Sequence, residues 1–288
     1  MYSEIASNKR KTVFIFFAFL IVATALGFAF SAYMGDIYLT PYVLLGATIY
    51  GIISYLFSSK MALALNGAHE IKKKDHPRLY RIVENLAITE GQPMPKVCVI
   101  DDPAMNAFAT GHKPKDATVC ATTGLINALN DKELEGVMAH EMAHVRNYDV
   151  RINMMAFALV AMISIMADIL IRSTWFRGRD SNNNMQFVAI FAAILAPIVA
   201  TLIQLAISRK REYLADASGA LTTRYPEGLA SALEKISKHG SKIKRQNTST
   251  AHLFFANPLK KDNVSSLLAT HPPIAERIKR LNTMGRHQ

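Results

Sequence analysis

Apolar residues are concentrated in four long stretches that are separated by polar sequence. These stretches cover residues 13–33, 37–57, 152–171 and 187–207. A helix needs about 20 mostly apolar residues to cross the roughly 30 Å hydrocarbon core of a bilayer, and each stretch is close to that length. The pattern therefore predicts four transmembrane helices. Asp168 and Gln204 lie inside the last two stretches, which leaves open the alternative that this pair is a buried hairpin that only dips into the bilayer.

The distribution of basic residues predicts the orientation of these helices. Basic runs stand before the first stretch, after the second and after the fourth, at 9–11, 72–74 and 209–211. The turn between the first two stretches has no basic residue, so both termini and the middle of the chain are expected in the cytoplasm. Three arginines between the third and fourth stretches oppose this assignment: Arg172, Arg177 and Arg179. The first stretch is too long for the core of a signal peptide and is expected to remain as an anchor.

The polar segments are expected to form one cytoplasmic domain that is interrupted by the second pair of helices. The predicted division is 1–57 for the first two transmembrane helices, 58–151 for the first part of the domain, 152–207 for the second pair, and 208–288 for the second part. Residues 58–75 are expected to be a polar connector and 241–250 a loop. A helix is expected to start at 131 and to continue without a stop into the third apolar stretch.

Three short apolar runs in the first part of the domain have the composition of β-strands. They cover 97–100, 106–111 and 118–122 and are separated by turn residues, so a small, mostly antiparallel sheet is expected. The predicted fold class is a mainly α integral membrane protein, with four transmembrane helices and a cytoplasmic α+β domain that contains this small sheet.

The charge pattern argues against nucleic acid as a partner, and the cysteine pattern argues against a zinc site made of cysteines. The formal net charge is +11, and the basic residues flank the apolar stretches, where they would meet anionic lipid head groups. Most aromatic residues lie in or beside those stretches instead of alternating with basic residues, so nucleic acid is not an expected partner. The two cysteines, Cys98 and Cys120, are expected to be buried reduced thiols, because they lie in strand-like stretches and show no CxxC spacing.

The pattern that carries chemistry is H-E-x-x-H at residues 140–144. On a helix, positions i and i+4 differ by about 40° in direction and about 6 Å in height, so His140 and His144 can converge on one metal ion. Glu141 lies beside the metal and off the ligand axis, where it can accept a proton from the attacking water. A similar start at His69 and Glu70 lacks the second histidine and is expected to be solvated surface.

A catalytic zinc ion needs a third protein ligand. The downstream candidates are Asp149, Asp168, Glu212, Asp216, His271 and Glu276. The third and fourth apolar stretches form a hairpin that returns the chain to the membrane face it left, which brings Glu212 back to the level of His144. Asp149 is expected on the same helix as the histidines and too close to fold back. One zinc ion per chain is therefore expected, held by His140, His144 and Glu212.

Asp216 lies one helical turn beyond Glu212. It is well placed to accept a hydrogen bond from the distal N–H of a ligating histidine, which would fix the tautomer of that ring. The alternative for Asp216 is a surface salt bridge with Arg209 or another base.

The segments 140–144 and 208–216, together with 106–111, 122–125 and 270–273, give the chain a close resemblance to the HtpX family. These are membrane-bound heat-shock metalloproteases, gluzincins related to the CAAX prenyl protease, and the resemblance covers nearly the whole chain. It implies a zincin-like, multi-pass protease of the bacterial inner membrane whose substrates are damaged or misassembled membrane proteins. It also implies that Glu212 is the third zinc ligand.

The resemblance further implies roles for two other segments. Residues Asn106, Ala107, Phe108 and Ala109 would form an edge strand onto which the substrate backbone adds, with an ordinary edge strand as the alternative. His271 would donate to the developing oxyanion and Arg277 would pair with a carboxylate. For both of these residues the alternative is local packing beside a proline turn.

Two other functions remain open at the level of sequence. One is a CAAX-type protease that acts on lipidated C-termini, although four spans argue against a closed chamber within the membrane. The other is a non-catalytic, zinc-stabilised membrane scaffold. Glu141 argues against the scaffold, because a structural zinc site would not need that residue.

Overall fold

The computed structural model describes residues 2–34, 36–176, 208–239, 243–244, 250, 253–256 and 272–285. The described helices are α1 (Tyr2–Met34), η1 (Ile37–Leu39), α2 (Thr40–Leu65), α3 (Pro77–Glu90), η2 (Pro114–Asp116), α4 (Thr123–Ala128), α5 (Asp131–Arg146), α6 (Asp149–Phe176), α8 (Arg209–Thr223), α9 (Pro226–His239) and α10 (Ile274–Gly285). The described strands are β1 (Ala68–Glu70), β2 (Lys96–Ile100), β3 (Ala107–Thr110) and β4 (Thr118–Thr122).

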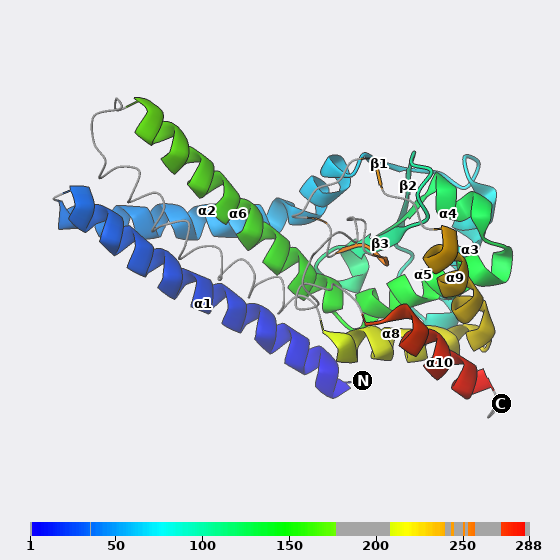
Figure 1. Ribbon diagram of the computed structural model, residues 1–288. Helices are drawn as coiled ribbons and strands as arrows, with labels where there is room; N and C mark the ends of the chain where they lie inside the picture. The colour runs from blue at the N-terminus through cyan, green and yellow to red at the C-terminus, as the bar shows by residue number, and fades with distance from the viewer. Residues whose placement is uncertain are drawn as a thin grey trace.

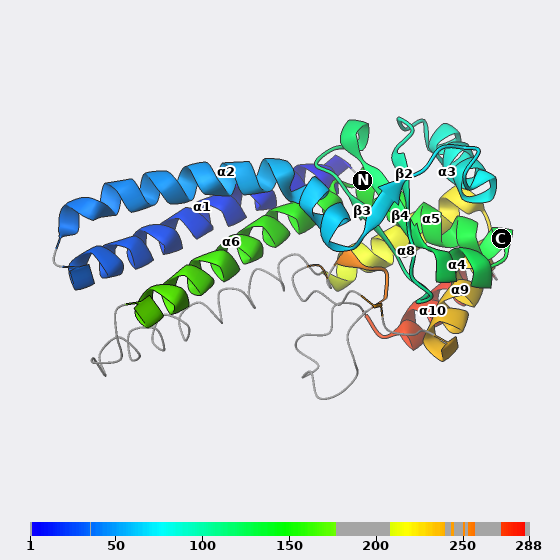
Figure 2. The ribbon, with the colours of Figure 1, turned by 90° about the horizontal axis from the view of Figure 1, so that it is seen from above.

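Three long helices, α1, α2 and α6, lie side by side and project from one side of the domain that holds the sheet (Figure 1, Figure 2). Apolar side chains of α1 and α6 are buried between these two helices: Ile15, Phe19, Ala23, Ile152, Met155, Leu159, Val160 and Ile163. On their outer faces α1 and α2 expose large apolar side chains, among them Phe14, Phe17 and Ile21 of α1 and Tyr42, Leu45 and Leu56 of α2. Contiguous exposed apolar surface of this kind is costly in water and favourable in lipid.

The helices predicted over 13–33 and 37–57 are confirmed as helices, but α1 already begins at Tyr2, and the bounds of α2 differ at both ends. A 3-10 turn at Ile37–Leu39 precedes α2, and α2 continues to Leu65, through part of the predicted connector. By length and composition, the stretch Ile37–Leu65 is long and apolar enough to cross a membrane. The predicted fourth helix, 187–207, and most of the predicted loop 241–250 lie outside the described residues.

The sheet has the strand order β1-β2-β4-β3. Two of its three strand pairs are antiparallel, so the prediction of a small, mostly antiparallel sheet is confirmed. The prediction missed a fourth strand and the parallel central pair. A fourth strand, β1, lies within the predicted connector and pairs antiparallel with β2. The central pair, β2 and β4, is parallel, because β3 follows β2 in the chain but pairs antiparallel with the far side of β4. Continuous apolar runs such as 97–100 are typical of strands buried on both faces, and that signal was present in the sequence.

Both cysteines are free and buried, as predicted. Cys98 and Cys120 lie opposite each other on the parallel pair β2 and β4.

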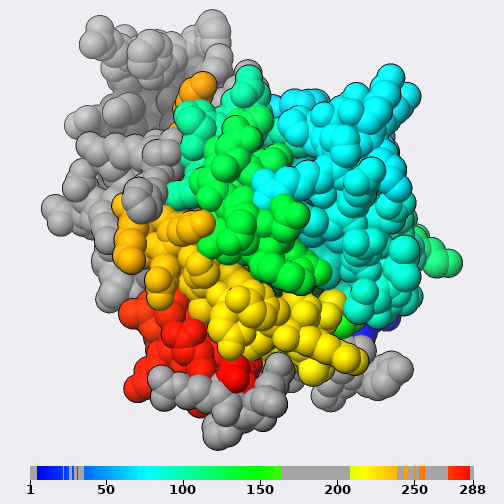
Figure 3. Space-filling model, turned by 90° about the vertical axis from the view of Figure 1, so that its right-hand side faces the viewer, coloured from blue at the N-terminus to red at the C-terminus, as the bar shows by residue number. Residues whose placement is uncertain are grey.

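The central helix of the domain is α5, which contacts β3, β4, α3, α8 and α9. It starts with a capping box: the Asn130 side chain accepts from the Glu133 N–H at 2.9 Å, and the Glu133 carboxylate accepts from the Asn130 N–H at 2.8 Å. Asn130 is thus the N-cap residue of α5. Figure 3, which views the domain from the side away from the long helices, shows parts of α8 and α9 in yellow to orange beside α5 in green and α10 in red.

The expectation of one continuous helix from 131 into the third apolar stretch was wrong. Helix α5 ends at Arg146, and α6 begins at Asp149. Between them Tyr148 has φ 60°, in the left-handed region, and two residues therefore turn the chain. Neither glycine nor proline marks this turn in the sequence, so the break was not visible there.

Candidate metal centre

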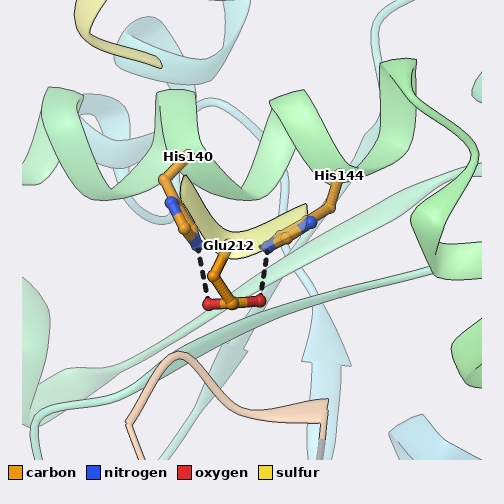
Figure 4. Close-up of side chains that lie close together, drawn as sticks. All are labelled: His140, His144 and Glu212. Carbon is orange, nitrogen blue, oxygen red and sulfur yellow. Dashed lines mark hydrogen bonds and ion pairs between the residues drawn. The ribbon is translucent and has the colours of Figure 1, made fainter. Parts of the chain in front are cut away.

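Two histidines of α5 and one glutamate of α8 point toward one another (Figure 4). The Nε2 atoms of His140 and His144 lie 3.1 Å apart. The carboxylate of Glu212 lies 3.8 Å from Nε2 of His140 and 3.4 Å from Nε2 of His144. One ligand atom from each of the three residues lies within 4.8 Å of the other two, and all three residues are buried. Two imidazoles and a carboxylate are the protein ligands of many catalytic zinc ions.

The remaining ring nitrogens are held by carboxylates. Nδ1 of His140 lies 2.9 Å from Asp216, and Nδ1 of His144 lies 2.9 Å from Asp149. A carboxylate on Nδ1 fixes the tautomer and orients the ring. Because both rings are held in this way, both direct Nε2 to the same point, and the residues present therefore fit a zinc ion.

The structure places Asp216 next to His140 and also next to a base. Arg277 of α10 donates to both Asp216 oxygens, from Nε at 2.8 Å and from Nη2 at 2.7 Å. Its guanidinium also lies 4.8 Å from the centre of the Phe255 ring. Arg277 and Asp216 are both buried, so the pair is internal and is not the surface salt bridge considered as an alternative. Arg277 thus contacts a carboxylate, as the family resemblance implied.

Asp149 is the residue of this centre that sequence reasoning missed. The sequence pattern places it on the same helix as the histidines, where it would be too close in the chain to fold back. The break at Tyr148 turns the chain back, so Asp149 reaches Nδ1 of His144 within five residues. Arg211 of α8 lies 3.5 Å from the other Asp149 oxygen. The carboxylate therefore joins the metal centre as a partner of a ligand.

Burial and charge shift the pKa values of this cluster in opposite directions. Burial lowers the pKa of His140 to about 4, although Asp216 opposes the shift. Burial would also lower the pKa of His144, but Asp149 and Glu212 outweigh it and raise that pKa well above its usual value. Burial would raise the pKa of Asp216, but Arg277 and then His140 lower it to about 2. The two carboxylates around His144 favour positive charge at this point, which a divalent cation would supply.

Glu141 shares a small cavity with the three candidate ligands. The cavity measures about 20 Å³ and is also lined by Ala109, Asn153 and Phe255. That is enough for about one water molecule. Glu141 is buried, and it lies beside His140 on α5. The structure thus brings a carboxylate and space for a water molecule next to the three candidate ligands.

The predicted substrate strand is β3, together with the preceding Asn106. The Asn106 amide contacts the backbone of Ala256 twice: Nδ2 donates to the carbonyl at 2.8 Å, and Oδ1 accepts from the N–H at 3.0 Å. The Phe255 N–H donates to the Ala107 carbonyl at 2.8 Å. The chain itself therefore covers the outer edge of β3 at Ala107.

The other two predicted substrate residues lie differently. The Phe108 side chain is buried, and its ring lies 5.1 Å from the ring of Phe254. Ala109 lines the cavity of the metal centre. Backbone polar groups alternate between the two edges of an antiparallel strand, so Ala109, two residues after Ala107, also directs its N–H and C=O outward. His271 lies outside the described residues.

Two histidines one turn apart, a glutamate between them, and a carboxylate from a second helix define a metallopeptidase. The model of peptidase family M48 matches residues 73–285. The chain belongs to peptidase family M48, and within it to the HtpX proteases.

The curated relatives cover the chain almost end to end. "Protease HtpX homolog" of Tropheryma whipplei (strain Twist) is 48% identical over 288 residues, 99% of each chain. That of Dictyoglomus turgidum (strain DSM 6724 / Z-1310) is 46% identical over 290 residues, 99% of this chain and 95% of the relative. That of Streptococcus uberis (strain ATCC BAA-854 / 0140J) is 42% identical over 296 residues, 99% of this chain and 100% of the relative.

The fold also resembles that of a structurally characterised protein. The crystal structure of S. mikatae Ste24p superposes with a TM-score of 0.52 at 19% identity, covering 98% of this chain and 67% of that chain. At this identity the likeness concerns the fold alone. The predicted family and the predicted metalloprotease activity are confirmed by the family match and the curated relatives.

Proposed function

We propose that this protein is a zinc-dependent membrane endopeptidase that hydrolyses peptide bonds of misfolded or damaged membrane proteins at the cytoplasmic face of the bacterial inner membrane. The observation that carries the proposal is the buried convergence of His140, His144 and Glu212, with Glu141 in the same cavity. A structural metal site would need neither the Glu141 carboxylate nor space for a water molecule.

His140, His144 and Glu212 would hold one zinc ion, and Asp216 and Asp149 would keep the two rings in place. Zinc, when bound, supplies a Lewis acid that lowers the pKa of water toward about 7 and polarises the scissile carbonyl. Glu141 accepts the proton of the attacking water and then passes it to the leaving amine. Arg277 keeps Asp216 ionised, so that Asp216 remains an acceptor for the His140 ring.

The long helices support the membrane location. The exposed apolar side chains of α1 and α2 would be in contact with lipid. The N-terminal end of α1 lies at the domain (Figure 1), and its basic residues Lys9, Arg10 and Lys11 are therefore at the same membrane face as the metal centre. By the positive-inside rule this face is the cytoplasmic one.

The outer edge of β3 supports recognition of unfolded substrate. An extended segment can pair with a strand edge through its backbone, which makes recognition largely independent of side chains. The Ala107 carbonyl already accepts from Phe255, so we place substrate pairing at Ala109, which lies at the cavity. Misfolded membrane proteins offer such extended segments, and the partners of this protein would be these proteins and the lipid bilayer.

The test uses protein purified in detergent, with zinc measured by metal analysis and cleavage measured on casein and on an unlipidated membrane protein. Glu141→Gln is expected to retain zinc and to lose cleavage. Glu135→Gln, on the same helix but in a surface contact with Lys132, is the matched control and is expected to cleave normally. Cleavage by zinc-loaded Glu141→Gln at the wild-type rate would end the assignment of the base.

The same assay separates the two alternatives. A CAAX-type protease would cleave only lipidated C-termini, and a scaffold would bind zinc without cleaving either substrate. The location is tested by alkaline carbonate extraction and by protease access from the cytoplasmic side of inverted vesicles. Release of the protein by carbonate would contradict a transmembrane protein.

A further inference from the structure

The N-terminal end of α1 reaches the metal centre through one buried asparagine. Asn8 is only 1% exposed. Its Nδ2 donates to Asp149 Oδ1 at 2.7 Å and to the backbone carbonyl of Asn147 at 2.9 Å. The other oxygen of Asp149 contacts Nδ1 of His144 at 2.9 Å. Two successive hydrogen bonds therefore join a predicted membrane helix to a candidate zinc ligand.

Asn8 contacts the turn that makes Asp149 available. This turn, Asn147 and Tyr148, separates α5 from α6 and places Tyr148 in the left-handed region. One amide group of Asn8 contacts the turn on both sides of Tyr148, at the Asn147 carbonyl and at the Asp149 carboxylate. The next residue of α1, Lys9, places its ammonium 4.5 Å from the centre of the Tyr148 ring. The first turns of α1 thus stabilise the conformation that directs Asp149 toward His144.

The rest of α1 is fixed relative to the same turn. Ile15, Phe19 and Ala23 are buried in the cluster that α1 forms with α6, and α6 begins at Asp149. A shift of α1 along α6 would therefore displace the Asn8 amide relative to the carboxylate. If the buried Asn8 amide and the buried Asp149 carboxylate separated, both would be left without this hydrogen bond. The observed position of α1 is therefore favoured over positions shifted along α6.

We propose that Asn8 is a positioning residue for the zinc site. It acts through Asp149, which holds the His144 ring in its ligating orientation. Metal binding therefore depends on the position of α1 relative to α6. This inference rests on the proposed function, because it takes His144 to be a zinc ligand. Mutation of a residue that hydrogen-bonds to a metal ligand typically lowers metal affinity by roughly 10- to 100-fold. Asn8 lies one contact further out than Asp149, so a change of roughly tenfold is expected for its loss.

The test measures zinc dissociation by chelator competition on the full chain in detergent, with the visible spectrum of the cobalt-substituted protein as a report on ligand geometry. Asn8→Leu keeps the approximate volume and removes the donor, and zinc should bind roughly tenfold more weakly, with an altered cobalt spectrum. Thr12→Val is the matched control. Thr12 is buried one turn later on α1, and its hydroxyl donates to the Asn8 carbonyl of its own helix, so zinc affinity should stay within twofold of wild type.

A double-mutant cycle distinguishes positioning from general packing. If Asn8 acts through Asp149, then Asn8→Leu should have little further effect on zinc affinity in an Asp149→Ala background. Full multiplication of the two effects, or a zinc affinity of Asn8→Leu within twofold of wild type, would overturn the proposal. Asn8→Ala is the second variant in case leucine prevents folding, and loss of folded protein in both variants would also overturn it. Failure here is separate from failure of the proposed function, which Glu141→Gln tests on its own.

Discussion

Nδ1 of His144 lies 2.9 Å from the carboxylate of Asp149, a residue only five positions further along the chain. On one continuous helix these side chains would not be directed at each other's polar atoms. They meet because α5 ends at Arg146 and Tyr148 turns the chain before α6 begins. The contact makes the junction between the metal-binding helix and a predicted membrane helix part of the metal centre.

This contact predicts the effect of neutralising Asp149. Asp149→Asn should weaken zinc binding by roughly 10- to 100-fold, because the His144 ring loses a charged partner that orients it. Chelator competition on the purified protein measures the change. The control is Asp131→Asn at the start of α5, the helix that carries His144, where the carboxylate is largely exposed and contacts Arg78. Unchanged zinc affinity in Asp149→Asn would show that the contact does not orient the ligand.

Because Arg277 and Asp216 form a buried ion pair, removal of the arginine is expected to destabilise the fold strongly. Arg277→Met leaves the Asp216 carboxylate buried without its base, and breaking a buried pair in this way costs roughly 3–5 kcal/mol. The free energy of unfolding, from urea titration in detergent, measures the loss. Arg280→Met, which removes a half-exposed ion pair with Glu276 on the same helix, should cost no more than about 1 kcal/mol. Equal losses in the two variants would contradict the importance of the buried pair.

Close approach of α8 to α5 predicts the effect of a single methyl group. A Cβ on Gly219 would lie 3.0 Å from the backbone nitrogen of His140 and 3.2 Å from the carbonyl carbon of Ala139. Because Glu212 is also on α8, Gly219→Ala should shift the third ligand, destabilise the domain by about 1–3 kcal/mol, and weaken zinc binding. Thermal unfolding and chelator competition measure the two effects.

The control for this substitution is Gly46→Ala on α2, where a Cβ would have no atom within 4 Å. Its stability should be unchanged or raised by up to about 1 kcal/mol, because alanine is the better helix former. Gly219→Ala with wild-type stability and wild-type zinc affinity would show that α5 and α8 can accommodate the added methyl group without a shift.

Backbone pairing at Ala109 predicts which peptides resist cleavage. A substrate with an N-methylated amide in the segment beside β3 loses one hydrogen bond, and kcat/KM should fall roughly tenfold, corresponding to about 1.4 kcal/mol. Exchange of neighbouring apolar side chains should change kcat/KM much less. A panel of peptides without lipid, each with one such change, provides the measurement. Strong dependence on side chains with no dependence on N-methylation would argue for a side-chain pocket in place of strand addition.

Much of the fold was predictable because it depends on local pattern. The apolar lengths of the first two stretches predicted helices that the structure contains as α1 and α2. The parallel pairing of β2 with β4 was missed, because strand order depends on which edge a later strand joins. Strand β1 was missed because three residues in a polar segment have no distinctive pattern.

The sequence by itself determined the pair His140 and His144, since i and i+4 positions converge on any helix, and it directed attention to Glu212 and Asp216 through their spacing on the returning helix. Only the tertiary structure decided that Asp149 turns back to His144, that Asn8 reaches the same carboxylate, and that Phe255 covers Ala107. Spacing along one helix is fixed by backbone geometry. Contacts between distant segments depend instead on how whole elements pack, which the free energy of the complete fold decides.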